Sequence, residues 1–379
     1  MNAQLASPAT DPGFQQTLQD VIAVDAQAVD VEGRYPRRAL EALARAGWLG
    51  LVSAREVGGM GLGHRAAAEV VRAIAERCGT TAMVVCMHYC GAAVIEAHGP
   101  REVREAIARG EHVSTLAFSE VGSRSMFWAP QSSAVAVEDG VALDADKSWI
   151  TSAGEADSYV WSSRPLAADA PSTIWLVDAK APGLTVAAPF DGLGLRGNAS
   201  SPVQARGVRV READRLGPDG GGFDVMMGIV LPYFNVMNAA VSCGLMEAAL
   251  RGAAAHAATT SYTHLRQALA DMPTVRAQLA RARVQADQAW LLVLDTVAAL
   301  EGGREDAMLR VLEVKAAAGD AALGVTDAAM RVGGGAAFRK EVGVERAFRD
   351  ARASSVMAPT ADALYDFIGK AVCGLPLFG

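Results

Sequence analysis

The sequence predicts an α+β fold in which a β-rich middle segment separates two helical regions. This fold class rests on the order of the patterns along the 379 residues and on a composition that is 51% hydrophobic and rich in alanine. Alanine favours closely packed helices, and the separation of strands from helices argues against alternating βαβ units. We expect an N-terminal helical domain over 1–110, a middle β-domain over 111–217 and a C-terminal helical domain over 218–379.

Both helical regions show apolar residues at three- and four-residue spacing, which is typical of amphipathic helices. Examples are ALEALARAGWLGL in the first region and VMNAAVSCGLMEAALRGAAAHAA in the second. A glycine-rich loop over 58–63 interrupts the first region once. The long apolar faces of the second region predict a four-helix bundle.

The middle segment consists of short runs rich in Val, Thr, Ser and Trp, separated by Gly, Pro and Asp. This texture predicts strands joined by turns. Residues 135–137 and 141–143 flank an Asp139-Gly140 pair, which predicts a β-hairpin.

The charge balance of 35 basic against 42 acidic residues gives a net charge of −7, and no stretch concentrates Lys and Arg. This excludes a nucleic-acid footprint and disfavours an anionic membrane partner. The first residues lack the basic and apolar regions of a signal peptide, and no run reaches roughly 18 uninterrupted apolar residues. We therefore expect a cytoplasmic protein with no membrane partner.

The five cysteines are scattered and form no CxxC pair, so we expect reduced thiols rather than a disulfide framework. Cys86, His88 and Cys90 are close in sequence, but no second cluster follows them, as a structural zinc site would need. We expect no metal site.

The most informative run in the middle segment is LAFSEVGSRS over 116–125, followed by KSWITS over 147–152. A strand end with hydroxyl groups and a Gly/Ser loop can present N–H groups and hydroxyls to a polar ring edge. Trp149 and Thr151 place an aromatic wall and a hydroxyl on one short strand. The pairing suits a planar heterocycle with an electron-accepting nitrogen.

These two runs resemble signatures of the acyl-CoA dehydrogenase superfamily, a strand ending in Thr-Glu-Pro-Gly-x-Gly-Ser and a later Lys-x-Trp-Ile-Thr-Asn. Residues 334–352, from GGAAF to VERAFRDAR, resemble the family's C-terminal signature. Residues 192–210, from GLGLRG to VRV, resemble the segment that closes its β-domain. The four matches follow the family's order and span nearly the whole chain.

The resemblance implies a β-barrel-like middle domain, a C-terminal four-helix bundle and FAD bound between them. It also implies a homodimer or homotetramer, because a neighbouring subunit completes the family's FAD site. The implied flavin contacts are Ser119 and Ser125 at the flavin end, Trp149 against the ring, Thr151 near its N5 and Thr360 just past the catalytic position. Gly334 and Gly335 match glycines that admit the pyrophosphate or adenosine portion close to the backbone.

The chain departs from the family at the catalytic position. Most members read Tyr-Glu-Gly-Thr there, and the Glu removes the α-proton of the substrate. This chain reads Met-Ala-Pro-Thr over 357–360, and Ala358 cannot accept a proton. A minority of members carry the base on an earlier helix, where this chain has Phe234.

The neighbours of Phe234 are also changed. Asn235 replaces an arginine that usually helps to hold the pantetheine arm of the thioester. The resemblance therefore implies a rewritten substrate contact formed by Tyr233, Phe234 and Asn235.

The cross-subunit FAD motif, Arg-x-x-Phe … Gln, falls on Tyr262, Leu265 and Pro273. Arg266 is a candidate to replace the missing cation against the pyrophosphate. Arg124 replaces a loop glycine beside the flavin edge, where it faces solvent or binds an acidic group of the substrate.

Three functions remain open. The preferred one is FAD-dependent α,β-dehydrogenation of an acyl thioester, on CoA or a carrier protein, with a non-standard proton acceptor and an unidentified electron acceptor. Candidates for the acceptor are Glu120, which also has a structural interpretation, Asp362, and a water held by Tyr233. The KSWIT run favours this function because it resembles the corresponding run of the family's dehydrogenases more closely than that of its monooxygenases.

The second function is a flavin-dependent monooxygenase that hydroxylates nitrogen or carbon, because residues 366–374 resemble the C-terminal ends of such enzymes. There His88 would hydrogen-bond a flavin hydroperoxide or the substrate. The third is a degenerate relative that binds flavin without turnover.

Overall fold

The computed structural model describes residues 8–123, 125–187, 189–262, 264 and 266–377. Along them, helices precede and follow a β-rich middle, which agrees with the predicted α+β class. The contacts within the chain divide it into two units. Unit 1 extends to Ala67 and includes Met83–Asp191 and Arg196–Phe234; unit 2 comprises Ala68–Ala82, Gly192–Leu195 and the chain from Asn235 onward. The units cross the two expected boundaries between the three domains, which stay a prediction.

Helices form the N-terminal part of unit 1. They are α1 (Pro12–Thr17), α2 (Ala23–Glu32), α3 (Arg37–Arg45), most of α5 (Gly79–His98) and α6 (Arg101–Ala108). Asp11 caps α1, because its carboxylate accepts a 2.8 Å hydrogen bond from the amide of Phe14. Gly33 ends α2 in the left-handed conformation, with φ at 64°.

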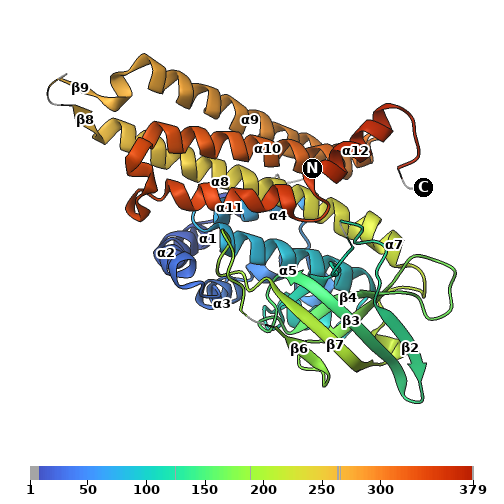
Figure 1. Cartoon of the computed structure of the whole chain (residues 1–379). Coiled ribbons are helices and arrows are strands. Elements are labelled where there is room, and N and C mark those ends of the chain that lie inside the picture. The colour runs from blue at the N-terminus through green and yellow to red at the C-terminus, as the bar shows by residue number, and fades with distance from the viewer. Residues whose placement is uncertain (1–7, 124, 188, 263, 265, 378–379) are drawn as a thin grey trace. The chain divides into compact units, whose positions relative to one another are not determined.

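The β-domain of unit 1 has two sheets (Figure 1). The first has the order β1-β4-β5, with β1 (Ser114–Ala117) parallel to β4 (Ser158–Ser163) and β4 antiparallel to β5 (Thr173–Asp178). The second is antiparallel, with the order β2 (Ser133–Val137), β3 (Gly140–Ile150), β7 (Ser201–Val210) and β6 (Leu184–Val186).

The predicted hairpin is present as β2 and β3. Val137 pairs with Gly140, so the turn residues are Glu138 and Asp139, one residue earlier than the sequence suggested. Gly140 takes a φ of 135°, and a Cβ there would lie 2.4 Å from the carbonyl oxygen of Val210. This close approach explains why the residue that starts β3 is glycine.

One apolar cluster joins the two sheets of the β-domain. Alternate residues of β3, such as Val141, Leu143 and Ala145, are buried, as expected for a strand with one face on the core. Trp161 and Trp175 pair across β4 and β5 and are both fully buried. This cluster packs β3 and β7 against the strands of the first sheet.

Long helices dominate unit 2. They are α4 (His64–Ala75) from Ala68 onward, α8 (Leu231–Thr259) from Asn235 onward, α9 (Pro273–Glu301), α10 (Ala307–Gly333), α11 (Val344–Val356) and α12 (Ala361–Val372). The short helix α7 (Gly222–Val225) precedes α8 in unit 1, and a small hairpin of β8 (Ser261–Tyr262) and β9 (Gln267–Ala268) connects α8 to α9. Figure 1 shows α8, α9 and α10 running side by side. Small buried residues on α10, such as Ala318, Gly319 and Ala322, let its neighbours approach closely.

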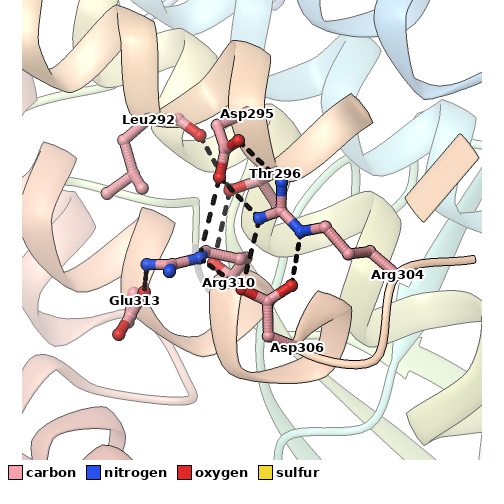
Figure 2. Close-up of polar contacts among 7 residues, drawn as sticks. All are labelled: Leu292, Asp295, Thr296, Arg304, Asp306, Arg310 and Glu313. Carbon is pink, nitrogen blue, oxygen red and sulfur yellow. Dashed lines mark hydrogen bonds and ion pairs between the residues drawn. The ribbon is translucent and has the colours of Figure 1, made fainter. Parts of the chain in front are cut away.

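A network of exposed ion pairs holds the turn between α9 and α10 (Figure 2). Arg304 in the turn pairs with Asp295 of α9 at 2.8 Å and with Asp306, just before α10, at 2.5 Å. Arg310 of α10 pairs with Asp306 at 3.0 Å and with Glu313 at 2.7 Å. Each exposed pair is individually weak, but the shared arginines couple them into one cluster.

Two helical segments are long and apolar enough to cross a membrane, Gly79–His98 and Gly222–Thr259. In each, 89% of the apolar window is buried within the protein. Core helices pass the same test of length and composition, so these segments are weak evidence for a membrane span.

Candidate functional site

The two motif runs of the middle segment lie next to each other in unit 1. The carbonyl of Ser119 accepts a 2.9 Å hydrogen bond from the amide of Ser148, and Glu120 forms an antiparallel bridge with Lys147. The strand end after β1 therefore runs along the last part of β3. Ser119 and Trp149, both predicted to contact flavin, are brought to one edge of the β-domain.

A buried ion pair fixes this arrangement. The ammonium of Lys147 is 2.6 Å from one carboxylate oxygen of Glu120 and also donates to the carbonyl oxygen and hydroxyl of Ser162, at 2.7 and 3.0 Å. The second oxygen of Glu120 accepts the amides of Gln131 and Ser132, at 2.5 and 3.1 Å. Burial acts to raise the pKa of Glu120, but the charge of Lys147 and these donors lower it overall.

Both oxygens of Glu120 are thus occupied within the fold. This is inconsistent with the catalytic role that we considered for Glu120 and supports its structural interpretation, in which the carboxylate holds the two motif runs together. Burial lowers the pKa of Lys147 to about 8, which still leaves the amine protonated at neutral pH. At pH 7 the pair is ionised on both sides.

Trp149 is 70% exposed and lies where the pairing of β3 with β7 is irregular. Its φ is 57°, a left-handed conformation that a bulky side chain rarely adopts and that costs about 1–2 kcal/mol. The ring packs edge-on against Phe190, with centroids 6.3 Å apart. A planar ligand stacked on the indole would explain why a large ring is exposed at a strained backbone position.

Thr151, by contrast, is buried, and its hydroxyl lies 3.1 Å from that of Ser200. Ser200 is held in turn, because its amide donates to the side-chain oxygen of Asn198 at 3.0 Å. The predicted contact of Thr151 with the flavin ring stays a prediction.

His88 lies in the interior of unit 1 with both ring nitrogens engaged. Nε2 lies 3.0 Å from the carbonyl oxygen of Leu49, and Nδ1 accepts the amide of Ser114 at 3.3 Å. This pattern specifies the neutral tautomer that donates from Nε2, and burial lowers the pKa of His88 to about 4. We correct our expectation for His88, because no ring nitrogen is left to bind a substrate or a flavin hydroperoxide.

Tyr233 stacks on His64, with ring centroids 3.9 Å apart and an angle of 26° between the planes. Burial raises the pKa of Tyr233 to about 12 and lowers that of His64 to about 4, so both rings are neutral at pH 7. Nε2 of His64 is buried and has no partner among the described residues. Phe234, next to Tyr233, is 7% exposed.

Asn235 belongs to unit 2 and is fully buried. Its side-chain nitrogen donates a 2.8 Å hydrogen bond to the carbonyl of Val311, which ties α8 to α10. Its side-chain oxygen is buried without a partner in the described part of the chain. This unpaired oxygen is available for the predicted substrate contact.

The turn between α11 and α12 lies in unit 2 and carries Ala358, which the resemblance matches to the family's catalytic position. Thr360 is the N-cap of α12, and its hydroxyl oxygen accepts a 3.4 Å hydrogen bond from the amide of Ala363. Asp362 lies in the first turn of α12 and is exposed.

The other predicted cofactor positions are peripheral in their units. A Cβ at Gly334 or Gly335 would meet no atom within 4 Å, so this backbone is open to close approach. Arg266 is exposed beside β9 with φ at 51°, and Ser125 is half-buried with φ at 71°. Arg124 lies outside the described residues, and its predicted role stays a prediction.

Sequence reasoning missed several residues that organise the site. It assigned no role to Lys147, although this lysine falls on the same alternation as the apolar Val141, Leu143 and Ala145, which was a usable signal. It also missed Lys315, a single charge in the alanine-rich run VKAAAG. The stacking of His64 on Tyr233 had no signal, because the two residues are 169 positions apart.

Comparison with known families gives three matches along the chain. The model for the acyl-CoA dehydrogenase N-terminal domain matches residues 13–110, that for the middle domain matches 115–208, and that for the C-terminal domain matches 220–373.

Individual relatives agree. The chain is 26% identical over 349 residues to the probable acyl-CoA dehydrogenase YngJ of Bacillus subtilis (strain 168), covering 90% of this chain and 91% of that protein. It superposes with a TM-score of 0.89 on butyryl-CoA dehydrogenase from Megasphaera elsdenii, at 22% identity over 98% of this chain and 100% of the other. An FAD complex of PigA gives a TM-score of 0.88 at 19% identity, with coverage of 98% and 99%. At such identities the structural likeness shows the fold.

Proposed function

The chain belongs to the acyl-CoA dehydrogenase family, and from this premise we propose that it catalyses α,β-dehydrogenation of an acyl thioester carried by CoA or by a carrier protein. The predicted superfamily and its fold are confirmed by the three matching domains. Membership makes the protein an oxidoreductase and FAD its cofactor, because proteins of this family depend on FAD.

The described residues fit this cofactor. Trp149 presents an exposed aromatic ring at a strained backbone position, and the backbone of Gly334 and Gly335 is open to close approach. When bound, FAD supplies a two-electron acceptor for a hydride from the β-carbon of the substrate. The single observation that supports the proposal is the exposed ring of Trp149, held at the end of a strand that the ion pair of Lys147 and Glu120 fixes.

The proton acceptor must differ from that of most relatives, because Ala358 has no basic group. Glu120 and His88 are occupied by other partners, and the raised pKa of Tyr233 excludes its own oxygen as the base, although its hydroxyl can still hold a water. Asp362 is the candidate whose carboxylate is exposed, two residues beyond Thr360. We propose that Asp362 accepts the α-proton, directly or through water, and that Thr360, two residues earlier in the same unit, contacts the flavin.

Anaerobic mixing with a panel of acyl-CoA and acyl-carrier thioesters tests the proposal. The wild-type protein is expected to lose its flavin absorbance with at least one thioester. Asp362→Asn is expected to slow this bleaching about a hundredfold, the usual contribution of a positioned base. Unchanged bleaching in Asp362→Asn would exclude Asp362 but leave the dehydrogenase function intact.

A gain-of-function variant tests the position of the substrate. Ala358→Glu installs a carboxylate where most relatives have one, and we expect it to accelerate bleaching about a hundredfold. Ala358→Gln is the matched control, because it has nearly the same shape and no base. Equal rates in the two variants would show that no α-proton is presented to position 358.

The apolar side chain of Ala358 also favours a second function, a flavin-dependent monooxygenase, which needs no base at that position. Absence of bleaching by every thioester, together with oxygen uptake that depends on a non-thioester substrate, would establish it. Flavin retention without either reaction would identify a degenerate relative. We further propose a cytoplasmic location, in keeping with the mixed, mildly acidic charge of the chain.

A further inference from the structure

Lys315 lies on α10 with 1% of its surface exposed. Its ammonium donates to three carbonyl oxygens, those of Ser354 at 2.9 Å, Met357 at 3.1 Å and Pro359 at 2.8 Å. All three acceptors belong to one short stretch, the end of α11 and the turn before α12. An ammonium has three N–H donors, and these three contacts are enough to engage all of them.

The charge of Lys315 suits this place. The last carbonyl groups of a helix have no partner within the helix and carry the negative end of its dipole, so a cation stabilises them. Burying an ammonium is costly unless hydrogen bonds offset the loss of water, and burial alone lowers the pKa of Lys315 to about 7.

Two neighbours in unit 2 complete the attachment of this stretch. The side-chain oxygen of Asn238 on α8 accepts a 2.9 Å hydrogen bond from the hydroxyl of Ser354, and its nitrogen contacts the sulfur of Met357 at 3.7 Å. Gly319 lies one turn after Lys315 on α10, where a Cβ would be only 2.9 Å from the hydroxyl oxygen of Ser354. The same face of α10 thus supplies both the charge and the space that the stretch needs.

We infer that Lys315 is a positioning residue, whose ammonium fixes the main chain of Met357–Pro359 and thereby places both the side chain at position 358 and the hydroxyl of Thr360. The hydrogen bonds from Lys315 to Ser354, Met357 and Pro359 reach main-chain oxygens, so these three bonds do not depend on which side chain stands at 358. The turn can therefore keep its shape when the carboxylate of most relatives is replaced by the methyl group of Ala358. The consequence for flavin rests on the proposed function, in which Thr360 contacts FAD.

The test compares three variants of the FAD-loaded protein. Lys315→Met removes every donor at similar volume, and Lys315→Arg keeps the charge and several donors. Thr326→Val on the same helix removes a hydroxyl that bonds the carbonyls of Ala322 and Leu323. Amide hydrogen exchange is followed at Ala361–Leu364, the first turn of α12. The dissociation constant of FAD and the position of the flavin absorbance maximum are measured in parallel.

Lys315→Met is expected to exchange about tenfold faster at these amides and to bind FAD about tenfold more weakly, the effect of losing hydrogen bonds from a charged donor. Lys315→Arg should recover most of both properties, and Thr326→Val should change neither. Unchanged exchange in Lys315→Met, or equal acceleration in Thr326→Val, would overturn the inference. Faster exchange with unchanged FAD binding and absorbance would support the positioning role of Lys315 and refute the contact of Thr360 with FAD.

If Lys315→Met does not fold, Lys315→Gln replaces it, because glutamine keeps two donors without the charge. Its exchange rate should then lie between those of wild type and a fully frayed first turn of α12. Wild-type exchange in Lys315→Gln together with wild-type FAD binding would overturn the requirement for the ammonium.

Discussion

Lys147 and Glu120 form a buried ion pair that joins the two motif runs in the interior of unit 1, and we expect it to contribute strongly to stability. Lys147→Met leaves the carboxylate buried without its cation, and we expect the free energy of unfolding to fall by about 3–5 kcal/mol. Urea denaturation measures it. The double variant Lys147→Met with Glu120→Met should recover much of the loss, whereas additive losses would show that the two side chains do not interact.

The same pair predicts the response to acid. The pKa of Glu120 is lowered below its ordinary value of 4.5 in the folded protein, so its stabilisation is complete above that pH and is lost as the pH falls through the folded value. Stability should therefore decline with falling pH below 4.5, and less steeply in Glu120→Gln. Thermal unfolding between pH 6 and about pH 3 tests this. Parallel curves for the two proteins would contradict it.

We expect the strained backbone conformation of Trp149 to contribute to FAD binding and not to the stability of the fold. Glycine adopts positive φ freely and the indole is largely exposed, so Trp149→Gly should leave the stability of the apoprotein within about 1 kcal/mol of wild type. The same change removes the aromatic surface, and the affinity for FAD should fall about tenfold. Urea denaturation and fluorescence titration separate the two effects. A large loss of stability with normal affinity would assign Trp149 to folding instead.

What the sequence revealed of these side chains depended on how local their chemistry was. The resemblance identified Trp149, Thr151 and Ala358 as the residues to examine, since motifs record short-range order. It could not show that His88 and Glu120 are consumed by internal hydrogen bonds, because their partners, Leu49 and Gln131 among them, carry no distinguishing pattern.

Helices and strands were more predictable than their junctions. Alternation along β3 and the three- to four-residue spacing of the helices report burial directly, so element type followed from sequence. The observed hairpin turn lies one residue before the predicted one. Gly140, which approaches Val210 closely, is the first residue of β3 and not part of the turn. Likewise, the division into two units follows from long-range contacts that no local pattern encodes.

The turn between α9 and α10 shows what surface charge contributes to an element. Arg304 serves two carboxylates, Asp295 and Asp306, and all three groups are solvent-exposed (Figure 2). Arg304→Ala should lower the melting temperature slightly at low salt and not at about 1 M salt, where the screening length is near 3 Å. Arg281→Ala, an exposed arginine on α9, is the control. An effect of Arg304→Ala that persists in high salt would point to packing rather than charge.

For the whole molecule, the oligomeric state can be predicted from the exposed surface of one helix. The resemblance implies a homodimer or homotetramer, and unit 2 exposes two large apolar side chains on one face of α9, Val284 at 55% and Leu291 at 63%. Residues seven apart share a helix face, so we propose these two exposed apolar side chains as contacts for a second copy. Leu291→Asp should therefore lower the oligomeric mass measured by analytical ultracentrifugation. Val24→Asp, at an equally exposed valine of α2, should not, and dissociation by both variants or by neither would remove α9 from the interface.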